Sequence, residues 1–75
     1  MQDRRLIRYT RHARQQMARR SISEDDVWLT LSDPDTVVPG EHSVETIAIK
    51  QFVRRRVRVV YVSEPDEVRI ITVTR

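Results

Sequence analysis

Cysteine is absent from this chain, and glycine, phenylalanine and tryptophan are nearly so. The 75 residues include no Cys and one each of Gly, Phe and Trp. Without cysteine there is neither a disulfide nor a thiolate metal site, and the single glycine, Gly40, excludes a glycine-rich phosphate loop. His12 and His42 are isolated, with no spacing to acidic residues that suits a metal. We therefore expect a protein that uses no metal and no other cofactor.

Long apolar runs are absent too. No stretch approaches the roughly 20 residues that a membrane-spanning helix needs. Residues 2–5 are polar or charged and no apolar segment follows them, so a signal peptide is not expected. These absences predict a cytoplasmic protein that does not associate with a membrane.

The chain is short enough to predict one domain, spanning residues 1–75. An apolar core of this size contributes only a few kcal/mol of net stability. A homodimer or a permanent protein partner would add to that stability, so both are candidate arrangements.

Lysine is nearly absent, whereas arginine is abundant. Of the 14 basic residues only Lys50 is lysine and the other 13 are arginine, against 11 acidic residues, for a net charge of +3. Residues 1–20 carry seven arginines and one acid, residues 23–45 carry seven acids and no basic residue, and residues 50–58 carry five basic residues. A guanidinium is planar and always charged, so it suits phosphate. The blocks indicate either a surface for nucleic acid or an acidic protein, or ordinary solvated faces that pair with the acidic block.

Two helices are predicted in the first half of the chain. Thr10 is a fair N-cap, and residues 11–20 are good helix formers without Gly or Pro. Ser23 is a second N-cap, followed by acidic residues that suit a helix N-terminus. The second helix is expected to run to about Leu31, because Asp33-Pro34-Asp35 ends a helix.

The remaining elements are predicted to be strands, because the hydrophobic period changes to two. The expected strands are residues 36–38, 44–53, 57–62 and 68–74, with turns at Pro39-Gly40, Arg54-Arg55 and 64–67. The strand that contains Val59-Val60 is apolar on both faces and is expected to be central. Residues 4–9, ahead of the first helix, fit either a short edge strand or an unstructured lead-in.

This order of elements predicts an α+β fold, with two N-terminal helices packed on an antiparallel sheet of three to four strands. The core is expected to combine apolar residues of both halves. The strands contribute Val37, Val38, Ile47, Ile49, Phe52, Val57, Val59, Val62, Val68, Ile70 and Val73, and the helices contribute Ala13, Met17, Ile22, Val27, Trp28 and Leu31.

The residues left for chemistry are arginine, histidine and tyrosine. Arg58 and Arg69 are expected on adjacent strands, where guanidiniums can clamp a phosphate bidentately, and Arg75 ends the sheet. Such groups support metal-free RNA cleavage, in which a base takes the 2′-OH proton, a cation stabilises the phosphorane and an acid protonates the 5′-oxygen. The plainer interpretation is that the strand arginines cover the solvent face, that His12 is a surface or half-buried helix residue, and that Tyr61 belongs to the core.

The ordered motifs resemble a known family. They are Thr10-Arg11-His12-Ala13, Arg20-Ser21-Ile22-Ser23, Asp26-Val27, residues 31–34, residues 56–61 and residues 68–75. In this order they resemble a bacterial domain family of unknown function. The second half is also similar to BrnT-type toxins of the RelE/ParE superfamily. The resemblance covers about Tyr9 to Arg75.

The resemblance implies a RelE/BrnT-like fold and a metal-independent mRNA endoribonuclease that a cognate antitoxin neutralises. It assigns the catalytic role to four residues: Arg58, Arg69, Arg75 and His12. Further RNA contacts are expected from the two arginine blocks: Arg54, Arg55, Arg56, Arg11 and Arg14. RNA and an antitoxin protein are therefore the expected partners.

Two other functions stay open. The chain fits a non-catalytic module that holds RNA or an acidic protein segment on the basic surface. It also fits an interaction protein whose exposed strand edge pairs with a partner or with a second copy. Binding that weakens as salt rises favours a basic surface, whereas salt-independent binding together with a concentration-dependent mass favours the strand edge.

Overall fold

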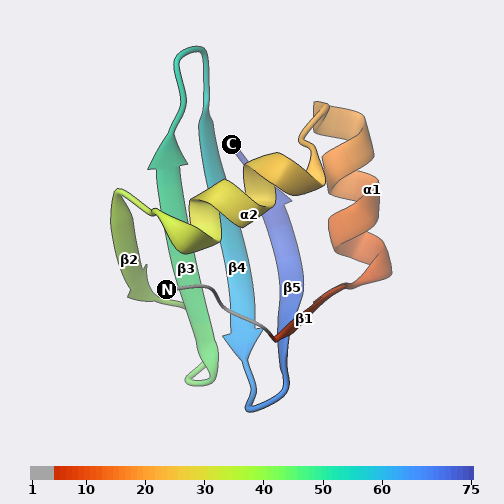
Figure 1. The fold of residues 1–75 in the computed structure, drawn as a ribbon, viewed down its shortest axis with the longest axis vertical. Coiled ribbons are helices and arrows are strands. Elements are labelled where there is room, and N and C mark those ends of the chain that lie inside the picture. The colour runs from red at the N-terminus through yellow and green to blue at the C-terminus, as the bar shows by residue number, and fades with distance from the viewer. Residues whose placement is uncertain (1–4) are drawn as a thin grey trace.

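A computed structural model describes residues 5–75. The elements are β1 (Leu6–Tyr9), α1 (Arg11–Arg20), α2 (Glu24–Ser32), β2 (Thr36–Pro39), β3 (Glu45–Gln51), β4 (Arg56–Ser63) and β5 (Glu67–Thr74) (Figure 1). Residues 4–9 contain an edge strand rather than an unstructured lead-in, although Arg4 lies outside the described residues. In the part that the structure describes, no helix is long and apolar enough to cross a membrane.

Helix α1 begins and ends where the sequence predicts. The hydroxyl of Thr10 accepts a hydrogen bond from the backbone N–H of Ala13 over 3.0 Å, so Thr10 is the N-cap. Ser21 follows the helix in the left-handed conformation, with φ of 56°. The backbone N–H of Ile22 then donates to the carbonyl of Met17 over 2.9 Å, which closes the last turn.

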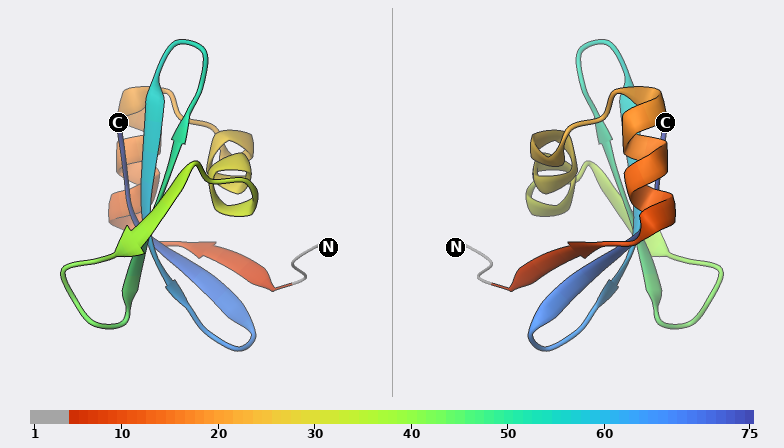
Figure 2. Two further views of the ribbon diagram at one scale, coloured as in Figure 1. Left: turned by 90° about the vertical axis from the view of Figure 1, so that its left-hand side faces the viewer. Right: turned by 90° about the vertical axis from the view of Figure 1, so that its right-hand side faces the viewer.

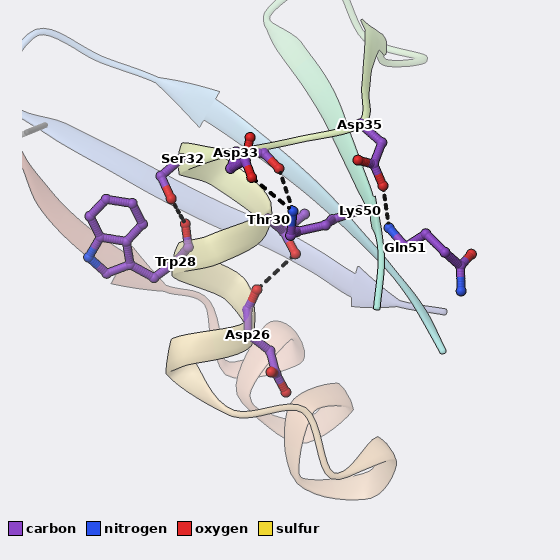
Figure 3. Close-up of polar contacts among 8 residues, drawn as sticks. All are labelled: Asp26, Trp28, Thr30, Ser32, Asp33, Asp35, Lys50 and Gln51. Atoms are coloured by element: carbon purple, nitrogen blue, oxygen red, sulfur yellow. Dashed lines mark hydrogen bonds and ion pairs between the residues drawn. The ribbon is translucent and has the colours of Figure 1, made fainter. Parts of the chain in front are cut away.

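Helix α2 also confirms its predicted start. The hydroxyl of Ser23 accepts from the backbone N–H of Asp26, and the carboxylate of Asp26 accepts from the backbone N–H of Ser23, both over 3.1 Å. This reciprocal capping box satisfies two N–H groups that a helix start leaves unpaired. At the other end, Lys50 on β3 donates to the carbonyl of Asp33 over 2.9 Å and fixes the exit of the helix (Figure 3).

The predicted sheet of three to four antiparallel strands is wrong. Across residues 5–75 the sheet has five strands in the order β1-β5-β4-β3-β2. Strands β2 to β5 form an antiparallel meander, but β1 runs parallel to β5, with Ile7 opposite Val68. Residues 6–9 show no long alternating pattern and their partner lies near the other end of the chain. Local periodicity therefore cannot reveal this strand pairing.

Side chains of α1 and its cap continue the sheet edge beyond β1. The backbone N–H of Thr10 donates to the carbonyl of Ile70 over 3.1 Å, and the Thr10 hydroxyl donates to the carbonyl of Ile71 over 3.2 Å. Six residues further along the chain, the Oε1 of Gln16 accepts from the backbone N–H of Val73 over 2.8 Å. Gln16 is 7% exposed. Its buried amide oxygen therefore supplies the hydrogen-bond acceptor that a neighbouring strand would normally supply to the N–H of Val73.

The register gives β4 two apolar faces, which confirms that it is central. Val59 lies opposite Ala48 on the face that the helices cover, and Val60 lies opposite Ile47 on the open face. A β-bulge at Val60/Tyr61 leaves Ile71 of β5 without a partner. The sheet is strongly twisted, and Figure 2 shows the β2–β3 loop and the β4–β5 turn splayed apart at one end.

The buried core lies between the helices and the middle of the sheet. Its members are Ala13, Met17, Ile22, Val27, Val57, Val59, Val68, Ile70 and Val73. Three predicted core residues, Val37, Val38 and Trp28, are exposed instead. The two valines lie on β2, at the sheet edge that neither α1 nor α2 covers (Figure 1). The Trp28 side chain projects away from α2 (Figure 3).

The predicted tight turn at Arg54-Arg55 is displaced by one residue. The backbone N–H of Phe52 donates to the carbonyl of Arg55 over 2.7 Å, which places Val53 and Arg54 in the middle of the turn. The shift turns the Arg55 side chain toward the α1–α2 junction, where it becomes part of the candidate site.

Candidate functional site

One end of the sheet gathers arginines that are far apart in the sequence. The last turn of α1, the β3–β4 turn and the residue after β5 meet there (Figure 1). The guanidinium of Arg55 donates to the carbonyl of Ser21 over 3.0 Å and ties the β3–β4 turn to the end of α1. Arg58 lies opposite Thr74, so β5 ends beside the start of β4. This region, the basic end, contains Arg19, Arg20, Arg54, Arg55, Arg56 and Arg75.

Most guanidiniums of the basic end have no neutralising carboxylate. Four of them are exposed and form no ion pair with any of residues 5–75: Arg19, Arg54, Arg56 and Arg75. The Nε of Arg20 is buried and has no hydrogen-bond partner among the described residues. The region therefore offers several positive charges to an anion from solvent.

Arg55, one of the predicted RNA contacts, has a different role. It forms an ion pair with Asp26 of α2 as well as its bond to the carbonyl of Ser21. Both charged side chains are mostly buried, at 28% and 20% exposed. Its guanidinium is thus used within the protein, where it fixes the helix junction against the β3–β4 turn.

The opposite end of the sheet is acidic and neutralises its arginines. Its carboxylates lie in the β4–β5 turn, in the β2–β3 loop and at the first residues of β5 and β3: Glu64, Asp66, Glu41, Glu67 and Glu45. Arg69 donates to Glu64 over 2.7 Å, and its Nε lies 3.9 Å from Glu67. Arg8, the neighbour of Arg69 on β1, lies 3.6 Å from Glu67.

The ion pair at this acidic end shifts both titrating groups toward their charged forms. The hydrogen bond from Arg69 lowers the pKa of Glu64 from its ordinary value of 4.5. The same bond raises the pKa of Arg69. Arg69 is therefore charged but compensated, unlike the arginines of the basic end.

The structure brings Arg58 and Arg75 near each other but not Arg69. Arg69 lies opposite Val62, four residues along β4 from Arg58, which corresponds to about 13 Å along the strand. Arg75 directly follows Thr74, the partner of Arg58. These three predicted catalytic arginines thus divide between the two ends of the sheet and do not enclose one phosphate.

Arg58 reaches a hollow of about 350 Å³ on the open face of the sheet. The hollow is lined by Glu41, His42, Glu45, Ile47, Arg58, Val60, Ile71 and Thr72. Its β2–β3 loop is held by two hydrogen bonds of 2.9 Å, from the N–H of Gly40 to the carbonyl of Glu45 and from the N–H of Glu45 to the carbonyl of His42. A Cβ on Gly40 would lie 2.7 Å from the Cβ of Glu45. Glycine is required there because the chain approaches itself so closely.

His12, the predicted catalytic histidine, lies elsewhere. It is exposed in the first turn of α1, a helix that packs along β5 and β1. The described residues that line the open-face hollow come from the sheet and the β2–β3 loop, not from α1. His42 shares the hollow with Arg58, and no sequence spacing signals this pairing, because the β2–β3 loop and the sheet register create it.

The remaining predicted contacts, Arg11 and Arg14, lie on α1. Arg11 is exposed, whereas Arg14 pairs with Glu24 and stacks 4.2 Å from the ring centroid of Tyr9. Burial raises the pKa of Tyr9, as does the charge of Glu24, while Arg14 opposes the increase. The phenol therefore stays protonated at neutral pH, and the stacked pair fastens β1 to α1.

Clustered metal ligands are not found in the described range. Within residues 5–75, no group of three or more His, Asp or Glu side chains is arranged so that it could hold a metal ion.

The fold and site define a small α+β domain with one arginine-rich end and one ion-paired end. This chain belongs to the family described as Domain of unknown function (DUF4258), whose model matches residues 9–75. The predicted membership in a domain family of unknown function is thereby confirmed. Comparisons with curated proteins and with solved structures found no match.

Proposed function

We propose that this chain is an RNA-binding domain related to BrnT-type toxins, and that its basic end contacts the RNA phosphates. The observation that carries this proposal is the convergence of arginines from three separate segments, most of them without a carboxylate partner among residues 5–75. Exposed guanidiniums match phosphate in shape and charge and gain affinity by releasing its counterions. An antitoxin that neutralises the domain is part of the same proposal.

The separation of charge also gives RNA one preferred position. The carboxylates of the β4–β5 turn and β2–β3 loop repel a phosphate backbone, whereas the basic end attracts it. Arg58 and Thr72 lie on the open face between them. RNA bound at the basic end would therefore continue onto the open face only as far as the hollow.

A paired set of variants tests the RNA proposal. The double variant Arg54→Glu, Arg56→Glu reverses two exposed charges, and we expect single-stranded RNA to bind at least about tenfold more weakly. The slope of log K against log salt is negative, and each lost phosphate contact should make it shallower by about 0.7. Fluorescence anisotropy of a labelled RNA over a salt series measures both quantities.

Arg69→Ala is the matched control, because the charge of Arg69 is already used by Glu64. It should leave the salt slope unchanged. Equal losses in Arg69→Ala and in the double variant would contradict a binding surface at the basic end. Equal binding of an acidic peptide and RNA by the unaltered protein would contradict RNA as the anion.

The open-face hollow favours cleavage as a second candidate function. A carboxylate, Glu45, and an imidazole, His42, line it together with Arg58. In such a site Glu45 takes the 2′-OH proton and the 2′-oxygen bonds to phosphorus while Arg58 stabilises the phosphorane. The bond from phosphorus to the 5′-oxygen breaks as His42 protonates that oxygen. The products are a 2′,3′-cyclic phosphate and a 5′-hydroxyl.

Cleavage is tested with mRNA in EDTA, with and without ribosomes. We expect 2′,3′-cyclic ends, a rate at least about 100-fold lower in His42→Ala, and an unchanged rate in His12→Ala. Intact RNA under both conditions would reject the cleavage candidate and leave RNA binding standing. Equal loss in both histidine variants would reject the assignment to the hollow.

A further inference from the structure

The outer side of α2 carries a second surface, which is apolar and acidic where the basic end is rich in arginine. Asp25, Trp28, Leu29 and Ser32 line one shallow depression there, and their spacing of three, four and seven residues places them on one helix face. Trp28 is 43% and Leu29 47% exposed. These two large apolar side chains face solvent although the opposite side of the helix packs on β3 and β4.

A deeper apolar hollow adjoins this face. It has a volume of about 100 Å³ and is lined by Arg5, Ile7, Trp28, Leu31, Ser32, Tyr61 and Val68. An apolar cavity of roughly 150 Å³ can take a benzene ring. The hollow is smaller than that, so it suits one apolar side chain rather than a whole small-molecule ligand.

Helix α2 is acidic, which restricts what can cover its outer side. Among the described residues that line the adjoining hollow, the one basic side chain, Arg5, donates to the hydroxyl of Ser63 and the carbonyl of Glu64. Helix α2 contains Glu24, Asp25 and Asp26 and no basic residue. Glu24 is paired with Arg14, and Asp26 with Arg55. The exposed carboxylate of Asp25 has no partner among residues 5–75, and it lies beside Trp28 in the shallow depression.

We propose that this α2 face, defined by Asp25, Trp28, Leu29 and the adjoining hollow, docks an amphipathic segment of a partner protein that carries a basic side chain beside an apolar one. The apolar side chain enters the hollow between Trp28 and Tyr61. The cation lies against the Asp25 carboxylate and the indole ring, which attract it by charge and by cation–π interaction.

Charge favours a basic protein segment over two other possible occupants of this face, a second copy of the chain and a nucleic acid. In a symmetric pairing of two copies through this face, two acidic α2 helices face each other, and α2 supplies no basic residue to pair with Asp25. A nucleic acid at this face would bring its phosphates close to the carboxylate of Asp25, which repels them, whereas the arginines of the basic end attract phosphate. A basic protein segment supplies the complementary charge.

The probe is a random peptide library displayed on phage and selected on the full chain, with counterselection on Leu29→Lys. We expect enriched peptides in which Lys or Arg neighbours a large apolar residue. Synthetic copies of them should shift the emission of Trp28, the one tryptophan of the sequence, to shorter wavelength. Asp25→Asn should weaken their binding about tenfold, and Leu29→Lys should abolish it.

Matched controls keep the result interpretable. Asp66→Asn and Val53→Lys alter an exposed carboxylate and a fully exposed valine away from α2, and both should bind the peptides normally. RNA binding should be unchanged in Asp25→Asn, so this proposal and the RNA proposal fail independently. The absence of enrichment, enriched peptides without a basic residue, or equal binding by Leu29→Lys would overturn the docking surface. A concentration-dependent mass that only Leu29→Lys abolishes would show instead that a second copy covers it.

Discussion

The two ends of the sheet use polar side chains in opposite ways. At the basic end, the ion pair of Arg55 with Asp26 is partly buried, and the hydrogen bond from the N–H of Val73 to Gln16 is buried. At the acidic end, the ion pairs of Arg69 and Arg8 lie in contact with solvent. A hydrogen bond contributes most where losing it leaves a buried group unpaired, so residue type alone does not tell which arginine matters for stability.

The largest expected effect breaks the buried contact beside the basic end. Gln16→Leu keeps a side chain of similar size but leaves the N–H of Val73 without its acceptor. We expect the free energy of unfolding to fall by about 1–3 kcal/mol, measured by urea denaturation. Gln15→Leu is the control, because the neighbouring Gln15 is exposed. Equal stability of the two variants would show that the edge of β5 does not depend on this amide.

A smaller loss is expected when the helix junction is released. Arg55→Ala removes the bonds to the Ser21 carbonyl and the Asp26 carboxylate. The pair is only mostly buried, so after allowing for solvent screening we expect a loss of about 1–2 kcal/mol. Arg54→Ala, on the exposed middle of the same turn, should change stability by less than about 0.5 kcal/mol. A similar loss in both variants would remove the distinction between structural and free arginines at the basic end.

The smallest effect concerns the exposed pair at the acidic end. Because Arg69 lowers the pKa of Glu64 below 4.5 in the folded state, the pair contributes stability above that pH. The contribution is lost as the pH falls through the folded pKa. Unfolding curves of the unaltered protein and Glu64→Gln should differ slightly at neutral pH and converge below pH 4.5. A gap that widens in acid would contradict this sign.

Residue patterns predicted which residue type forms the site, but not which individual residues are free to bind. The sequence pointed to arginine as the functional group and identified the blocks that contain it. It did not distinguish Arg55, whose guanidinium is held by Asp26, from Arg54 one position earlier. It also favoured His12, although His42 shares the hollow with Arg58. Pairing between distant residues decides both cases, and such pairing leaves no local pattern.

Local interactions explain which parts of the fold followed from the sequence alone. Thr10 and Ser23 cap the two helices of the described range through bonds to residues three positions away, and alternation marked β3, β4 and β5. These signals depend on neighbours in the chain, so they can be read without a fold. The α+β order of the elements follows from them.

Only the tertiary structure decided how the edges, ends and outer surfaces are used. It paired β1 in parallel with β5, although the two strands lie at opposite ends of the chain, and it supplied Gln16 as the acceptor for Val73 where β5 extends beyond β1. It left Trp28 in solvent and gathered separate arginines at one end. The physical reason is that burial and charge pairing depend on which segments meet in space, and the free energy of those meetings is a property of the folded chain rather than of any local stretch.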